Sequence, residues 1–224
     1  MLKSLAKKTN MIYNILKQID YSVRQEYFKK GIASMGWIYF LLLIPLNMVL
    51  PSSWGAENSV VENIQMICLI ASGIMCYRYL DVKLVQWNGS QKALCYAGTL
   101  YFFLLAMREI SWGRALILHP DGSTYQYSEM GIYGQLVHPV VGILLALLMY
   151  LLYRAKLWNF MRILKFPTKY FILLLLYIFM SWLGEKGSFS MFHGELAEEL
   201  AELGVYSMMF YLVRDSLEKL RIKD

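Results

Sequence analysis

Six apolar stretches, each long enough to cross a lipid bilayer as a helix, most constrain what this chain can fold into. A helix needs about 20 apolar residues to span a hydrocarbon core about 30 Å thick, because each residue advances about 1.5 Å. The stretches cover residues 34–50, 60–80, 93–114, 133–153, 169–184 and 195–213. We therefore expect an all-α, polytopic integral membrane protein with a six-helix transmembrane bundle.

The distribution of basic residues predicts how this bundle is oriented. Lys and Arg gather before the first stretch, between the second and third, between the fourth and fifth, and after the last, whereas the other connections carry only Lys186. Because Lys and Arg mark the cytoplasmic side of a membrane, both termini are expected in the cytoplasm. Three parts follow: a basic amphipathic segment on the inner membrane surface (1–33), the six-span domain (34–213) and a basic cytoplasmic tail (214–224).

The charge balance supports a membrane protein and argues against nucleic-acid binding. The chain is 58% hydrophobic and 17% charged, whereas soluble domains are about 45–50% apolar and about 25% charged. Its net charge of +6 combines a strongly basic cytoplasmic side with an acidic outer side. Acidic residues contribute little to topology, so they need another explanation. We expect the lipid bilayer, and no nucleic acid, among the partners.

Four glutamates at the start of the last stretch form the main candidate site. Glu195, Glu198, Glu199 and Glu202 recur at helical spacing and therefore share one face. A helix dipole explains an acid in the first turn but not Glu202, roughly 10 Å further along. Ionisable groups inside a bilayer usually mark function. Glu199 and Glu202 are candidate catalytic residues, although a solvated helix start would also explain the stripe.

The end of the third stretch supplies further candidates. Glu109 lies between Arg108 and Arg114 and is a candidate catalytic residue, with an internal ion pair as the structural alternative. Arg114 and Lys186 are candidate phosphate-binding residues, because a cation can hold a phosphate group. Trp112 is a candidate substrate contact, although a Trp at a membrane interface needs no further role.

The histidines suggest a metal ion. His119, His138 and His193 all fall on the outer side, where the glutamates gather. His and Glu suit Zn, Mn or Fe, so a divalent metal is an expected cofactor. The candidate metal ligands are His138, His193, Glu198, Glu202 and Glu62. The alternatives are that His138 is hydrogen-bonded between helices and that His119, followed by Pro-Asp-Gly, is a plain turn residue.

The same segments resemble a loosely defined family of uncharacterised polytopic membrane proteins from bacteria. The resemblance rests on Glu109-Ile110-Ser111-Trp112-Gly113, on the acidic entry to the second stretch (Glu57 and Glu62) and on the Glu198, Glu199 and Glu202 pattern. The family pattern has Glu and Gln where this chain has Arg108 and Arg114. The resemblance implies a site near these residues, but no activity. From the predicted spans and basic connections we expect the protein in the inner membrane.

Three functions fit these observations. The first is a membrane-embedded, metal-dependent enzyme, such as a hydrolase acting on a lipid or lipid-linked substrate at the outer leaflet, with a metal-bound water and a glutamate as general base. The second is a cation or proton transporter or channel that uses the same acidic cluster. The third is a non-catalytic membrane subunit, in an oligomer or bound to another membrane protein.

Overall fold

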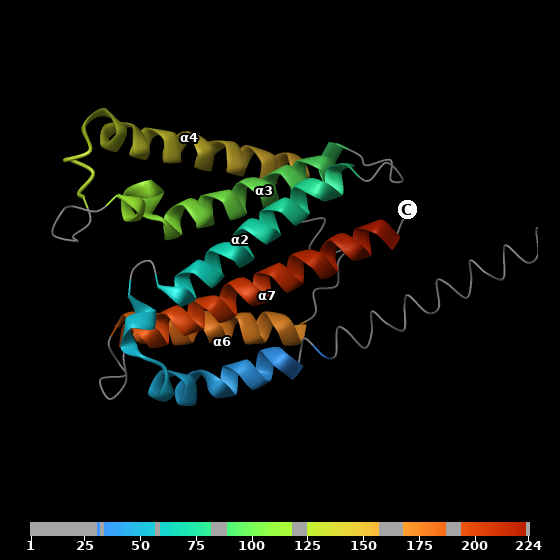
Figure 1. Cartoon of the computed structure of the whole chain (residues 1–224). Helices are drawn as coiled ribbons and strands as arrows, with labels where there is room; N and C mark the ends of the chain where they lie inside the picture. The colour runs from blue at the N-terminus through green and yellow to red at the C-terminus, as the bar shows by residue number, and fades with distance from the viewer. Residues whose placement is uncertain are drawn as a thin grey trace, which may run out of the picture. The chain divides into compact units, whose positions relative to one another are not determined.

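The computed structural model describes residues 31, 34–56, 59–81, 89–117, 125–156, 168–186 and 194–222 (Figure 1). These residues are helical or form connections, and none of them belongs to a strand. The helices are Ser34–Val49, α2 (Val60–Arg78), α3 (Gly89–Glu109), α4 (Gly131–Ala155), α6 (Thr168–Glu185) and α7 (Gly194–Ile222), with short 3-10 segments η1 (Ser52–Gly55), η2 (Tyr79–Asp81) and η3 (Ser111–Leu116). The predicted all-α fold is confirmed.

Each apolar stretch coincides with one helix, but several boundaries differ from the prediction. Helix α3 ends at Glu109, before the end of the stretch 93–114, and α7 continues to Ile222 through most of the predicted tail. Two segments, Ser52–Arg78 and Gly131–Ala155, are long and apolar enough to cross a membrane by length and composition. The predicted amphipathic segment 1–33 lies outside the described residues, apart from Gly31.

The chain divides into two compact units, Met1–Leu41 and Leu42–Asp224. Residues 34–41 of the first unit begin the helix Ser34–Val49. In the second unit the five long helices pack in the order α4, α3, α2, α7, α6, so the last helix of the chain lies between α2 and α6 (Figure 1). This insertion brings the glutamates of α7 beside α2.

Small residues allow the helices to approach closely. Gly204 of α7 packs against the ring of the fully buried Tyr177 of α6, and Gly98 of α3 lies beside Cys76 of α2. Gly55 in η1 lies against the backbone of Leu196 at the start of α7. Close contact through glycine is typical of helices that associate by van der Waals packing in membranes.

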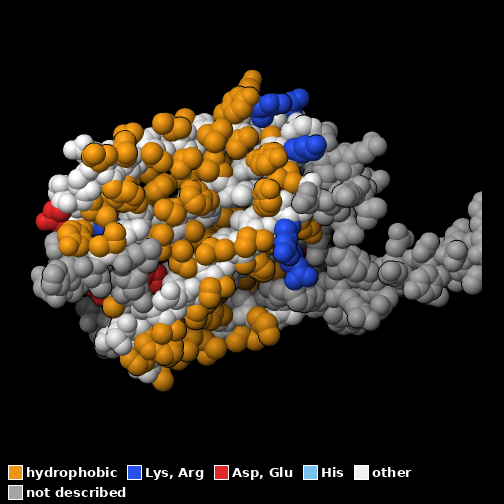
Figure 2. Space-filling view, turned by 45° about the horizontal axis from the view of Figure 1, so that its top comes forward, with side chains coloured by type: hydrophobic (Ala, Val, Ile, Leu, Met, Phe, Trp, Pro, Cys, Tyr) orange, Lys and Arg blue, Asp and Glu red, His pale blue; other side chains and the backbone are white. Residues whose placement is uncertain are grey.

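The outer helix α4 leaves most of its apolar side chains exposed. Ile132, Ile143, Met149 and Tyr153 are 66–82% exposed, and α4 packs chiefly against α3. On the face drawn in Figure 2, hydrophobic side chains cover the middle, with Lys and Arg at one end and acidic residues at the other. Water would disfavour such a surface, whereas lipid would solvate it.

Candidate functional site

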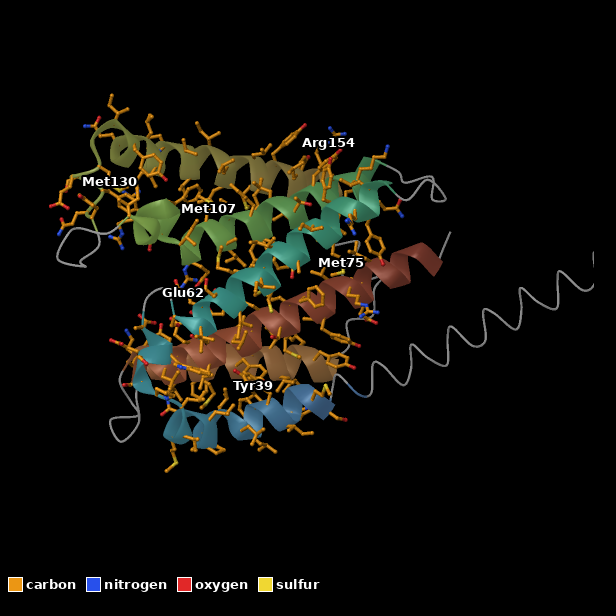
Figure 3. The ribbon with its side chains drawn as sticks, viewed as in Figure 1. Tyr39, Glu62, Met75, Met107, Met130 and Arg154 are labelled. Atoms are coloured by element: carbon orange, nitrogen blue, oxygen red, sulfur yellow. The ribbon has the colours of Figure 1, made fainter. Side chains whose placement is uncertain are left out.

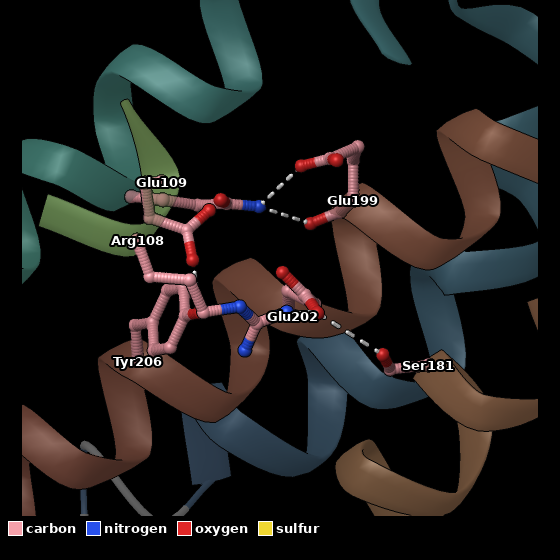
Figure 4. A network of polar contacts seen from close by, with 7 residues as sticks. Arg108, Glu109, Ser181, Glu199, Glu202 and Tyr206 are labelled. Carbon is pink, nitrogen blue, oxygen red and sulfur yellow. Dashed lines mark hydrogen bonds and ion pairs between the residues drawn. The ribbon is translucent and has the colours of Figure 1, made fainter. Parts of the chain in front are cut away.

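Polar side chains from four helices meet in one network, which we call the carboxylate cluster (Figure 4). It consists of Gln65 of α2, Arg108 and Glu109 of α3, Ser181 of α6, and Glu199, Glu202 and Tyr206 of α7. Glu199, Glu202 and Tyr206 share a face of α7 because they are spaced by three and four residues. Helix α7 packs against α2 and α6, and side chains of this face reach Arg108 and Glu109 at the end of α3.

Gln65 fixes Glu199. Its Nε2 atom donates one hydrogen bond to the Glu199 carbonyl oxygen and another to the Glu199 carboxylate, both at 2.8 Å. Gln65 is completely buried, and its Oε1 atom has no hydrogen-bond partner among the described residues. The side-chain amide thus ties α2 to α7 and leaves one buried acceptor facing no donor.

Tyr206 and Arg108 hold the other two carboxylates. The Tyr206 hydroxyl donates a 2.7 Å hydrogen bond to Glu109, which joins α7 to the end of α3. The Arg108 guanidinium lies 3.6 Å from Glu202, and the Ser181 hydroxyl of α6 lies 3.5 Å from the same carboxylate oxygen. The Arg108 side chain is 65% exposed, whereas that of Glu202 is only 15% exposed. One side of the cluster therefore carries an accessible cation.

The cluster holds more negative charge than its one guanidinium balances. Glu109, Glu199 and Glu202 lie close enough to interact electrostatically with one another. Three like charges in an apolar setting are costly unless protons or a bound cation offset them. The arrangement can therefore take up and release protons, or bind a cation, at the three carboxylates.

The other predicted glutamates, Glu195, Glu198 and Glu62, lie at the border of the cluster or outside it. Glu195 is exposed; Glu198 is half-buried and interacts electrostatically with Arg108 and Glu202, so it borders the cluster, whereas Glu199 and Glu202 form its hydrogen bonds and ion pair. Glu62 is half-buried in the first turn of α2, where its backbone N–H donates to the Ser59 side chain and caps the helix. Glu195 and Glu62 are therefore explained as acidic residues in the first turn of a helix. Glu199 and Glu202 are explained as members of a functional site.

A tight turn places Glu109 at the end of α3. Ser111, Trp112 and Gly113 all have positive φ values, of 46°, 55° and 84°, which end the helix. Left-handed Ser and Trp are strained, and such residues persist where neighbours hold them. The hydroxyl of Tyr127 donates to Ser111 O, and that of Tyr133 donates to Trp112 O. Trp112 is half-buried in this turn, outside the hydrogen-bonded cluster.

Neither of the two predicted phosphate-binding residues takes part in the hydrogen bonds or the ion pair of the cluster. The Arg114 guanidinium lies over the Tyr127 ring, 5.3 Å from its centroid, in a cation–π arrangement. Lys186 is exposed just after the end of α6. The cation that contacts a cluster carboxylate is instead Arg108, which the sequence suggested only as a flanking charge.

Among the described residues, the predicted metal ligands His138, Glu62, Glu198 and Glu202 do not form a metal-binding group. His138 is exposed on α4 and its ring packs edge-on against Tyr127, 5.5 Å between centroids. His193 and His119 lie outside the described residues. Within the described part of the chain, no group of three or more His, Cys, Asp or Glu side chains is arranged to hold a metal ion.

Sequence reasoning gave the carboxylates of the cluster but missed most of their partners. Gln65 follows Glu62 by three residues on one face of α2, and Tyr206 follows Glu202 by four on α7, so both had a spacing signal. Ser181 had no such spacing signal.

The chain was compared with protein-family models, with curated proteins and with solved structures. It matches no protein or family in any of the three comparisons.

Proposed function

We propose that the chain is a six-span membrane protein of the inner membrane, with both termini in the cytoplasm. The alternation of basic connections and the exposed apolar surface of α4 support this proposal. The separation of basic and acidic ends in Figure 2 fits the same orientation, with the carboxylate cluster in the outer half of the bilayer. Lipid would then solvate the exposed apolar side chains.

We further propose that the carboxylate cluster carries out acid–base catalysis on a lipid or lipid-linked substrate. The observation that carries this proposal is the meeting of Glu199 and Glu202 of α7 with Glu109 and the exposed Arg108 of α3. Paired carboxylates in different surroundings commonly divide into an acid and a base. Here Glu202 faces a guanidinium, whereas Glu199 faces a neutral amide.

The residues suggest a hydrolytic sequence of proton transfers. Glu202 takes a proton from water, the resulting hydroxide attacks an acyl carbon or phosphorus, and Glu199 gives a proton to the leaving oxygen. Arg108 holds a phosphate of the substrate, because its side chain is exposed and lies on the same face of α3 as the exposed Tyr101. Tyr206 positions Glu109. No step requires a metal, and elemental analysis of the purified protein tests the predicted divalent ion separately.

The test compares Glu202→Gln with Glu195→Gln in liposomes containing phospholipids and polyprenyl phosphates. Both substitutions neutralise one glutamate of α7, but Glu195 is exposed and Glu202 contacts Arg108. We expect mass spectrometry to show product formation that falls at least about 100-fold for Glu202→Gln, the usual loss when a general acid or base is removed. Glu195→Gln should stay within about twofold of the unaltered protein. Equal product formation by both variants would overturn the catalytic proposal.

A second candidate, proton transport, is favoured by a buried carboxylate further along α7. Asp215 is only 4% exposed, and 13 helical residues from Glu202 correspond to about 20 Å. Between them the Tyr211 and Tyr170 hydroxyls are 3.3 Å apart. Proton flux into liposomes that disappears in both Glu202→Gln and Asp215→Asn, with no lipid product from the unaltered protein, would select transport over catalysis.

A further inference from the structure

A second polar site lies at the opposite end of the bundle from the carboxylate cluster. A cavity of about 440 Å³ opens between the start of α3 and the end of α4, and it is lined by Gly89, Ser90, Tyr153, Arg154 and Lys156. Figure 3 shows Arg154 at this end of α4, beside α3. We call this cavity the basic pocket. None of its residues takes part in the carboxylate cluster.

The charges of the basic pocket are not balanced. No carboxylate of the described residues forms an ion pair with Arg154 or Lys156, and both residues are exposed. The first backbone N–H groups of α3, at Gly89 and Ser90, add partial positive charge at the same cavity, because a helix leaves its first four amides without internal partners. Every charge or partial charge of these groups is therefore positive, which suits an anion.

The surroundings indicate which anion fits. Tyr153 is 82% exposed, and it follows an α4 surface on which Met149 and Tyr150 are also exposed. An aromatic side chain at the border between apolar surface and basic residues is typical of the level of lipid head groups. Basic pockets between transmembrane helices on the cytoplasmic side bind anionic head groups. A phosphate held there would leave acyl chains free to lie along α4.

We propose that the basic pocket binds the phosphate of an anionic phospholipid from the cytoplasmic leaflet. Arg154 supplies a planar guanidinium that can form two hydrogen bonds to phosphate oxygens, and Lys156 supplies a second charge. This inference rests on the membrane-spanning part of the proposed function and is independent of the chemistry of the carboxylate cluster. It requires only the start of α3 and the end of α4, which line the cavity.

The experiment measures lipid binding to the full chain in detergent by native mass spectrometry. Phosphatidylglycerol is the anionic probe and phosphatidylcholine the zwitterionic one. For the double variant Arg154→Gln/Lys156→Gln we expect phosphatidylglycerol affinity to fall by about 25-fold, because each cation near a head group contributes about fivefold. Each single variant should lose about fivefold, so the result does not depend on the double variant alone.

The matched control is Arg78→Gln/Lys92→Gln, which removes the same charge from exposed residues at the same end of α2 and α3 but outside the pocket lining. Its affinity should stay within about twofold of that of the unaltered protein. Equal losses in the two double variants would reduce the effect to overall charge and overturn the proposal. Displacement of phosphatidylglycerol by inorganic phosphate, with no preference over phosphatidylcholine, would assign the pocket to a soluble phosphate and overturn the lipid assignment. In the Glu202→Gln background the double variant Arg154→Gln/Lys156→Gln should cause the same loss of phosphatidylglycerol affinity, which separates this test from that of the cluster.

Discussion

Gly204→Ala should destabilise the protein by about 3 kcal/mol, near the upper end of what overpacking usually costs. A methyl group at Gly204 would overlap the ring of Tyr177, whose Cζ atom would be 2.8 Å away. Tyr177 is completely buried between α6 and α7, so its ring has no free space to enter. The free energy of unfolding, measured by titrating a denaturing detergent into mixed micelles, reports the loss.

Gly142→Ala is the matched control for this prediction. Gly142 is also inside a helix, but no atom lies within 4 Å of a methyl group placed there. Alanine favours a helix by about 0.5–1 kcal/mol over glycine, so this variant should be neutral or slightly more stable. Tyr177→Leu should restore part of the stability lost in Gly204→Ala, as a double-mutant cycle would measure. Equal effects at Gly204 and Gly142 would show that the α6–α7 contact is not as described.

Gln65→Glu should destabilise the fold by about 3–5 kcal/mol, the range seen when a buried charge lacks a partner. The substitution replaces the amide that donates two 2.8 Å hydrogen bonds to Glu199 with a second carboxylate. Because Gln65 is fully buried, water cannot separate the two charges. The same titration in mixed micelles measures the effect.

Two further variants separate charge from hydrogen bonding at Gln65. Gln65→Met keeps the approximate size and removes only the amide, so it should cost about 1–3 kcal/mol, the penalty for leaving buried acceptors unpaired. Adding Glu199→Gln to Gln65→Glu exchanges the amide and the carboxylate between α2 and α7. This double variant should recover most of the stability. If Gln65→Glu is no less stable than Gln65→Met, the two side chains do not face each other.

The helices could be predicted because hydropathy and length decide them locally. Every apolar stretch is a helix, since the backbone polar groups of an apolar segment are best satisfied within a helix. The end of α3 was predicted too late. Hydropathy does not report the left-handed turn at Ser111 and Trp112, which depends on hydrogen bonds from Tyr127 and Tyr133.

The order of the helices could not be predicted, because it depends on contacts between distant segments. Residues 194–222 of α7 lie between α2 and α6, and only this arrangement brings Gln65 to Glu199 and Tyr206 to Glu109. The carboxylates were predicted from their spacing and depth. His138 was predicted at the same depth as the carboxylates. It lies on α4, however, which is the first helix in the packing order α4, α3, α2, α7, α6, and its ring contacts Tyr127.

The proposal that the carboxylate cluster lies inside a membrane is tested most directly by carbodiimide labelling of the full chain in native membranes. An apolar carbodiimide enters the bilayer, whereas a water-soluble one modifies carboxyl groups in water. We expect Glu199 to react with the apolar reagent and to be protected from the water-soluble one, and the exposed Glu195 to react with the water-soluble reagent. Mass spectrometry of the peptides reads both sites in one sample. Modification of Glu199 by the water-soluble reagent as fast as that of Glu195 would contradict a membrane-embedded cluster.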